Sequence, residues 1–100
     1  MLLFCRVPEG QRVELTCSAT DASGTQWTQW LADAPFESLR GVSGRVTGLF
    51  ESVTAANAGQ FTCLTINGAV YLYQSVKLVV VPARSATPPA IYQLDTHMVV

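Results

Sequence analysis

Charged side chains are scarce in this chain of 100 residues, and they do not cluster. Lysine and arginine together number 6, aspartate and glutamate 7, and the formal net charge is −1. Proteins that bind nucleic acid or an anionic membrane surface present a stripe of basic side chains. No such stripe exists here, because the basic residues are spread between positions 6 and 84. The charge pattern therefore argues against nucleic acid or a membrane surface as the main partner.

The residue types that carry enzyme chemistry are also nearly missing. His97 is the only histidine, and no Cys-x-x-Cys spacing is present from which a thiolate zinc site could be built. The acidic residues are dispersed, so no acid and base stand as a pair. We therefore expect a non-enzymatic protein with no catalytic site, no cofactor and no metal ion.

Long apolar runs and helical patterns are absent as well. No run reaches the roughly 20 residues of a membrane-spanning helix, so we expect no membrane insertion. Residues 1–5 are too short for a signal peptide, and neither asparagine starts an Asn-x-Ser/Thr acceptor site for an N-linked glycan. Apolar residues nevertheless make up 49% of the chain, which suffices for one domain with one hydrophobic core.

Short segments with a two-residue period take the place of helices. The clearest covers residues 11–18, where Val13, Leu15 and Cys17 alternate with polar residues. Such alternation indicates a strand with one buried face. Further strands are predicted over residues 25–32, 46–53, 61–66 and 69–81, with at best a short edge strand within 33–44. Many short strands separated by turns are typical of a two-sheet sandwich.

Two glycines carry specific structural expectations. Gly48, inside a predicted strand, indicates a bulge or the close approach of another group. Asn67-Gly68 is typical of a two-residue hairpin turn in which both residues have positive φ. That turn predicts three cross-strand pairs, namely Ile66–Ala69, Leu64–Tyr71 and Thr62–Tyr73.

Cys17, Trp30 and the run from Asn57 to Cys63 carry a family resemblance. The run, Asn-Ala-Gly-Gln-Phe-Thr-Cys, resembles the Asp-x-Gly-x-Tyr-x-Cys signature of the immunoglobulin superfamily, with Asn57 for Asp and Phe61 for Tyr. The resemblance covers roughly residues 5–81 and implies an all-β fold, a two-sheet antiparallel immunoglobulin-like Greek-key sandwich. Too few residues separate Trp30 from Cys63 for a variable domain, so the chain resembles the intermediate-set or a short constant-2-like type.

The alternation and the resemblance together assign the core. They place Trp30 against a facing pair, Cys17 and Cys63. The other predicted core residues are Val13, Leu15, Phe50, Phe61 and Leu78. An oxidised pair implies an extracellular or cell-surface protein, whereas a reduced pair would resemble cytoplasmic sarcomere-type domains. Cys5 is expected to be a buried thiol in the first strand.

A second set of residues is assigned to the outside of the sheet that holds the hairpin. Trp27 and Trp30 are three apart in a strand, so they point to opposite faces, and Trp27 takes the outer one. The predicted exposed set is Trp27, Leu31, Leu64, Ile66, Tyr71 and Tyr73. A contiguous aromatic and aliphatic patch usually marks a contact site. A shifted register, a bulge after Gly68 or cover by the C-terminal tail would each remove it.

The C-terminal residues extend beyond the resemblance. Residues 82–90 form a proline-containing linker and 91–100 an apolar strand, so we expect an immunoglobulin-like domain over 1–81 and the start of a following domain over 82–100. The resemblance implies a protein-interaction module from a longer tandem chain, either a receptor or adhesion ectodomain or a sarcomere-type cytoskeletal protein. Its partner would be another protein, a neighbouring immunoglobulin domain or a second copy in a homodimer. The alternative is a structural spacer of a sarcomere-type cytoskeletal or adhesion chain, without a specific ligand.

Overall fold

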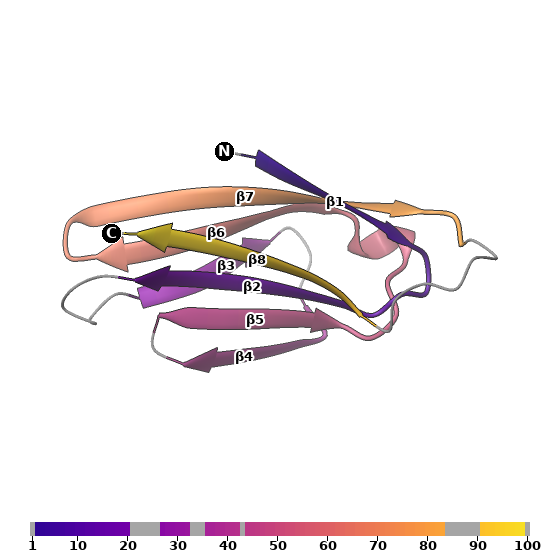
Figure 1. Ribbon diagram of the computed structural model, residues 1–100, viewed down its shortest axis with the longest axis horizontal. Coiled ribbons are helices and arrows are strands. Elements are labelled where there is room, and N and C mark those ends of the chain that lie inside the picture. The colour runs from indigo at the N-terminus through magenta and orange to yellow at the C-terminus, as the bar shows by residue number, and fades with distance from the viewer. Residues whose placement is uncertain (1, 21–26, 33–35, 43, 84–90, 100) are drawn as a thin grey trace.

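Nearly all of the described chain is β-strand. The computed structural model describes residues 2–20, 27–32, 36–42, 44–83 and 91–99. Its elements are β1 (Leu2–Pro8), β2 (Val13–Thr20), β3 (Trp27–Ala32), β4 (Ser38–Val42), β5 (Arg45–Phe50), the 3-10 turn η1 (Ala55–Asn57), β6 (Gly59–Asn67), β7 (Val70–Val81) and β8 (Tyr92–Val99). They form two four-stranded sheets, ordered β1-β7-β6-β3 and β4-β5-β2-β8 (Figure 1). The predicted all-β two-sheet sandwich is confirmed.

The strands fall where the two-residue alternation predicts them, with their ends displaced by a few residues. The one irregular tract, residues 33–44, contributes β4 at the edge of the second sheet. The apolar residues after the linker form the predicted strand, β8, and it pairs with β2 in the same sandwich. The division of the chain into a domain over 1–81 and the start of another over 82–100 stays a prediction.

In each sheet, one edge strand runs parallel to its neighbour, and all the other neighbouring strands are antiparallel. β1 runs parallel to β7, and β8 runs parallel to β2, whereas the other four pairings are antiparallel. Two parallel neighbours cannot be joined by a tight hairpin, because such a turn reverses the direction of the chain. The turn after β1 carries the chain into the opposite sheet, so β1 is left beside the much later β7.

The hairpin between β6 and β7 differs from the predicted one. Asn67 pairs with Val70, so the turn residues are Gly68 and Ala69, and the register is shifted by two residues. Gly68 has φ of 59°, while no described residue other than glycine has positive φ. Glycine at the first turn position is the pattern of a type II′ turn, whereas a type I′ turn was expected for Asn-Gly. Both turn types match the twist of the strands that they connect. A shift of two residues leaves every side chain on its predicted face.

The core lies between the sheets and is held by one disulfide. Cys17 and Cys63 are bonded across the sandwich, with their Cα atoms 5.5 Å apart. Trp30 is half-buried, stands opposite Cys63, and donates a hydrogen bond from Nε1 to the carbonyl oxygen of Leu15 at 3.2 Å. The fully buried cluster consists of Val7, Val13, Leu15, Phe50, Val53, Phe61 and Leu78. All the residues assigned to the core from the sequence therefore lie within or against it.

Phe36 completes this core, although the sequence pattern did not indicate it. Its ring lies 5.0 Å from those of Phe50 and Phe61 and 5.9 Å from that of Trp30, measured between centroids. The same ring covers Gly48, where a Cβ atom would collide with it. Gly48 therefore permits the close approach of another group, the second of its two sequence-based explanations. It keeps regular pairing on both sides, so there is no bulge.

Candidate interaction face

The outer face of the first sheet carries the residues that the sequence assigned to a contact site. β3, β6 and β7 bring them together in three rows across the sheet, each row made of directly opposed residues. The rows are Trp27–Ile66–Tyr71, Gln29–Leu64–Tyr73 and Leu31–Thr62–Ser75. We call the apolar part of this surface, Leu31, Leu64, Ile66, Tyr71 and Tyr73, the hairpin face. Its members come from three strands, so the fold has to form before the face exists.

Three side chains of the hairpin face are open to solvent. Tyr71 is 55% exposed, Tyr73 58% and Leu31 43%, while Ile66 is half-buried. The side chain of Trp27 lies outside the described part of the structure, although its backbone pairs with Ile66. Tyrosine is among the residues most enriched at the energetic hot spots of protein contacts, because it buries much area while losing few rotamers.

Leu64 was predicted to be exposed, and this is wrong. Its side chain is only 6% exposed. Gln29 and Tyr73 stand directly opposite it on the two neighbouring strands, and side chains so placed lie about 5 Å apart on one face. Because Leu64 sits on the central strand of the three, these longer side chains cover it from both sides. Leu64 is therefore the floor of the hairpin face, and the tyrosines form its accessible surface.

Polar residues border the hairpin face along the sheet, away from the turn. The Thr62 and Ser75 hydroxyl oxygens lie 3.0 Å apart, and Gln60 Nε2 donates a hydrogen bond to Ser75 Oγ at 3.3 Å. Val70, beside the turn, is 49% exposed, but it stands opposite Asn67 and so lies on the other face of the sheet from Tyr71 and Tyr73. An apolar centre with a polar border is the usual layout of a protein contact.

The C-terminal strand does not cover the hairpin face. β8 lies at the edge of the second sheet, next to β2, and so belongs to the opposite layer of the sandwich (Figure 1). Of the three alternatives that would remove the patch, cover by the described strand of the tail, β8, therefore does not occur. The register is shifted, but by an even number of residues, so the face keeps its composition.

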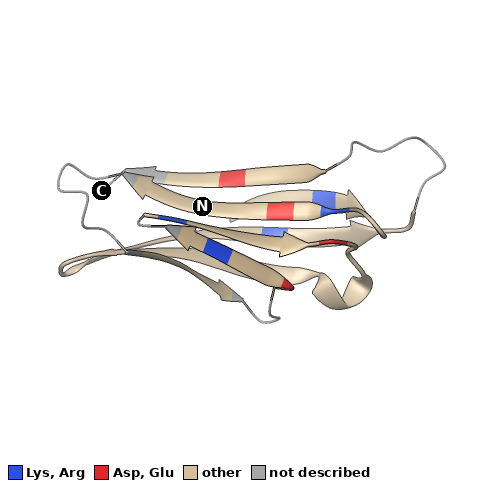
Figure 2. Ribbon diagram, turned by 90° about the horizontal axis from the view of Figure 1, so that it is seen from below, with Lys and Arg blue, Asp and Glu red and all other residues tan. Residues whose placement is uncertain are grey.

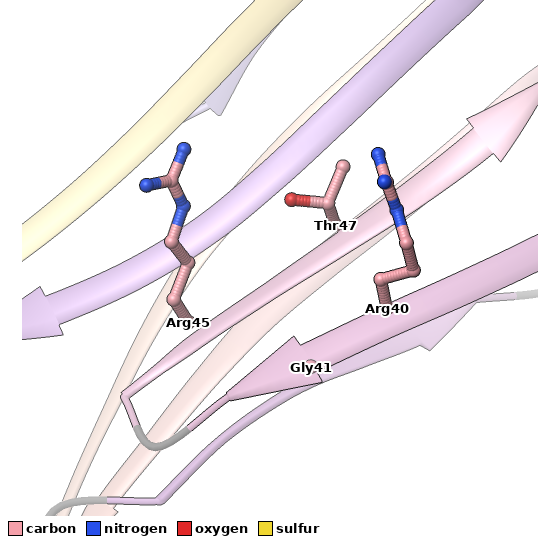
Figure 3. Close-up of a pocket in the computed structure, with 4 residues that line it drawn as sticks. All are labelled: Arg40, Gly41, Arg45 and Thr47. Carbon is pink, nitrogen blue, oxygen red and sulfur yellow. The ribbon is translucent and has the colours of Figure 1, made fainter.

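A second surface feature lies on the outside of the other sheet. It is a pocket of about 310 Å³ lined by Arg40, Gly41, Arg45 and Thr47. Figure 3 shows the two arginine side chains standing on the same side of β4 and β5, with Thr47 between them. Arg40 Nη2 lies 3.9 Å from Glu14 Oε1, and charges of both signs share the surface of the described chain (Figure 2). Glu14 therefore offsets part of the positive charge that Arg40 brings to the pocket.

Reactive groups are few in the described part of the chain. No three histidine, cysteine or acidic side chains are grouped there in a way that could hold a metal ion. Cys5 is an unbonded, half-buried thiol packed against the core, and burial raises its pKa above the ordinary value. Among the described residues, no helix has the length and apolar character needed to cross a membrane.

Comparison with solved structures places this arrangement among immunoglobulin domains. A chain in the crystal structure of the titin M10–obscurin-like 1 Ig complex superposes with a TM-score of 0.62 at 19% identity, covering 84% of this chain and 90% of that one. The M1 domain from titin gives a TM-score of 0.60 at 16% identity, with 84% and 94% covered. At such identities the likeness shows the immunoglobulin fold.

Longer solved chains contain the same fold. Titin domains z1z2 in complex with telethonin give a TM-score of 0.68 at 14% identity, covering 82% of this chain and 44% of that one. The twitchin kinase region from C. elegans gives 0.61 at 20% identity, with 78% and 15% covered. No protein-family model and no curated protein sequence matches the chain.

Proposed function

We propose that this domain is a non-enzymatic protein-interaction module that binds a protein partner through the hairpin face. The observation that carries the proposal is the exposure of Tyr71, Tyr73 and Leu31 around a buried leucine floor. An isolated surface leucine or tyrosine needs no explanation, but three on one flat sheet face form a patch of the kind that contacts are built on. Solved structures of the same fold that are complexes with another protein, telethonin or obscurin-like 1, also support the proposal.

We further propose an intermediate-set or short constant-2-like domain from a tandem chain. In the described part of the chain one strand, β4, lies between β3 and β5, and the β6–β7 hairpin is tight. Similar structures come from multidomain proteins such as titin and twitchin, and some were solved with another protein, telethonin or obscurin-like 1. These titles support a protein partner or a neighbouring immunoglobulin domain for the present chain.

The compartment in which the protein works depends on whether Cys17 and Cys63 are bonded there. A bonded Cys17–Cys63 pair supports an extracellular or cell-surface setting, because such bonds persist where the environment is oxidising. The sarcomeric origin of the similar titin domains supports the other setting, a cytoplasmic one with reduced thiols. Counting reactive thiols in the natural protein, unfolded without reductant, decides between them: one thiol places it outside the cytoplasm and three place it inside.

The binding proposal is tested with two matched double variants. Tyr71→Lys with Tyr73→Lys adds charge to the hairpin face, while Phe4→Lys with Leu39→Lys changes two equally exposed apolar residues elsewhere. We expect the tyrosine pair alone to lower the concentration-dependent mass in sedimentation and to raise the salt needed for precipitation. Circular dichroism checks that both variants fold.

A second candidate, a structural spacer without a specific ligand, makes the opposite forecast. A spacer has no preferred contact, so both double variants would shift solubility equally and neither would change the mass. That result would replace the binding proposal with the spacer of a sarcomere-type or adhesion chain.

A further inference from the structure

The edge of β2 is occupied by the last strand of the chain. All eight residues of β8 pair with β2 in parallel, from Val13 opposite Tyr92 to Thr20 opposite Val99. The Tyr92 backbone N–H also donates to the carbonyl oxygen of Arg12 at 2.9 Å. The other edge of β2 is filled by β5. Without β8, one full row of β2 backbone donors and acceptors would face solvent.

Side chains make this pairing specific as well. Thr96 is 1% exposed, and its Oγ1 donates a hydrogen bond to the Thr16 carbonyl oxygen at 3.1 Å. Leu94 and Tyr92 pack against the hydrophobic core. On the outer face, Gln93 Nε2 donates a hydrogen bond to Glu14 Oε2 at 3.2 Å. β8 therefore docks as a strand with inward anchors and one register.

β8 is held to β2 by contacts between residues that are far apart in the sequence. The bonded residues are about 80 positions apart, Thr16 and Thr96 being an example. The covalent connection is the ten residues 82–91 between the end of β7 and the start of β8. Ten extended residues span up to about 36 Å, more than the 19–20 Å width of the sandwich.

We propose that β8 is an exchangeable strand and that two copies of this chain form a dimer by swapping it. In the dimer, Tyr92–Val99 of one copy pairs with β2 of the other, using the same contacts as within one copy. Every bond of the docked strand is kept, so the balance between the two forms depends only on protein concentration and on the connection. For a connection of this length the effective concentration within one copy is on the order of 1 mM.

An engineered disulfide in the full chain distinguishes the two forms. Glu14→Cys with Gln93→Cys places two thiols at directly opposed positions of β2 and β8, and Cys5→Ser removes the natural free thiol. The chain is incubated at concentrations from about 10 µM to about 1 mM, oxidised, and run on a non-reducing denaturing gel. Glu14→Cys with His97→Cys is the control, because those positions are four residues out of register.

Exchange predicts a cross-linked monomer at low concentration and a cross-linked dimer that rises to about half of the protein near 1 mM. The dimer band must return to monomer with reductant and be absent from the out-of-register control. A dimer formed through the hairpin face would leave the disulfide within each copy and dissociate on the gel, so the two proposals fail separately. A cross-linked monomer at every concentration, or no cross-link at all, overturns strand exchange.

Discussion

Gly48 offers a quantitative test of how the aromatic core is packed. The Phe36 ring lies where a Cβ at position 48 would be, while Gly48 itself remains in regular β5 pairing. Gly48→Ala therefore forces one methyl group into the space filled by the Phe36 ring, which itself packs against Phe50 and Phe61. Overpacking of this kind costs about 1–3 kcal/mol. In a domain of this size, that corresponds to a fall in Tm of roughly 4–24 °C.

Gly41 on the neighbouring strand is the matched control. A Cβ there would meet no atom closer than 3.7 Å, an ordinary van der Waals contact. Replacing a strand glycine by alanine removes the entropic penalty of glycine, which is about 0.5–1 kcal/mol. We therefore expect Gly41→Ala to be neutral or slightly stabilising. The unfolding free energies of both glycine variants are measured by urea unfolding, with circular dichroism as the signal.

A double-mutant cycle assigns the penalty to the Phe36 ring. In a Phe36→Ala background the space above Gly48 is open, so Gly48→Ala should cost nothing or stabilise. The coupling free energy between the two positions should be about 1–3 kcal/mol, equal to the overpacking penalty. If Gly48→Ala and Gly41→Ala have equal effects, or if the Gly48 penalty persists without the ring, the packing described for Phe36 is refuted.

Three further outcomes follow from the core. Trp30→Ala should lower the unfolding free energy by about 3–5 kcal/mol, because it removes a large packed ring and its bond to Leu15; a loss below about 1 kcal/mol in urea unfolding would contradict this placement. Thr65→Val should instead stabilise by about 1 kcal/mol, since the fully buried Thr65 hydroxyl has no hydrogen-bond partner; calorimetry showing a lower Tm would contradict it. Thiol titration should find one reactive group after unfolding without reductant, and that group, Cys5, should react slowly in the folded protein because burial raises its pKa.

Local alternation was sufficient to predict the strands, and together with the family resemblance it predicted the core around Cys17 and Cys63, although not whether the two are bonded. Val13, Leu15 and Cys17 alternate with polar residues in β2, and a strand with that pattern has only one way to face a core. Phe36 could not be predicted in the same way. It lies outside any strand, in an irregular tract, so no period assigns its ring to the inside.

The hairpin face was predicted in composition but not in detail. The alternation of side chains along a strand predicts the face on which each residue lies. That prediction holds although the register is shifted, because the shift is an even number of residues. The alternation does not give exposure, which depends on the length of the cross-strand neighbours, and Leu64 is covered by two of them. The position of β8 was equally beyond a local pattern, since its partner strand lies about 80 residues earlier.

The pairing of β2 with β8 also sets an order of events during synthesis. β2 leaves the ribosome well before the strand that fills its edge, since His97 follows its neighbour Ser18 by 79 positions. At about 5–20 residues per second, that edge waits roughly 4–16 s for its partner. Cys63 follows Cys17 by only 46 residues, so in an oxidising compartment the two layers can be covalently joined before β8 exists. In such a compartment the newly made sandwich therefore exists for a time with its central disulfide formed and one edge of β2 unpaired.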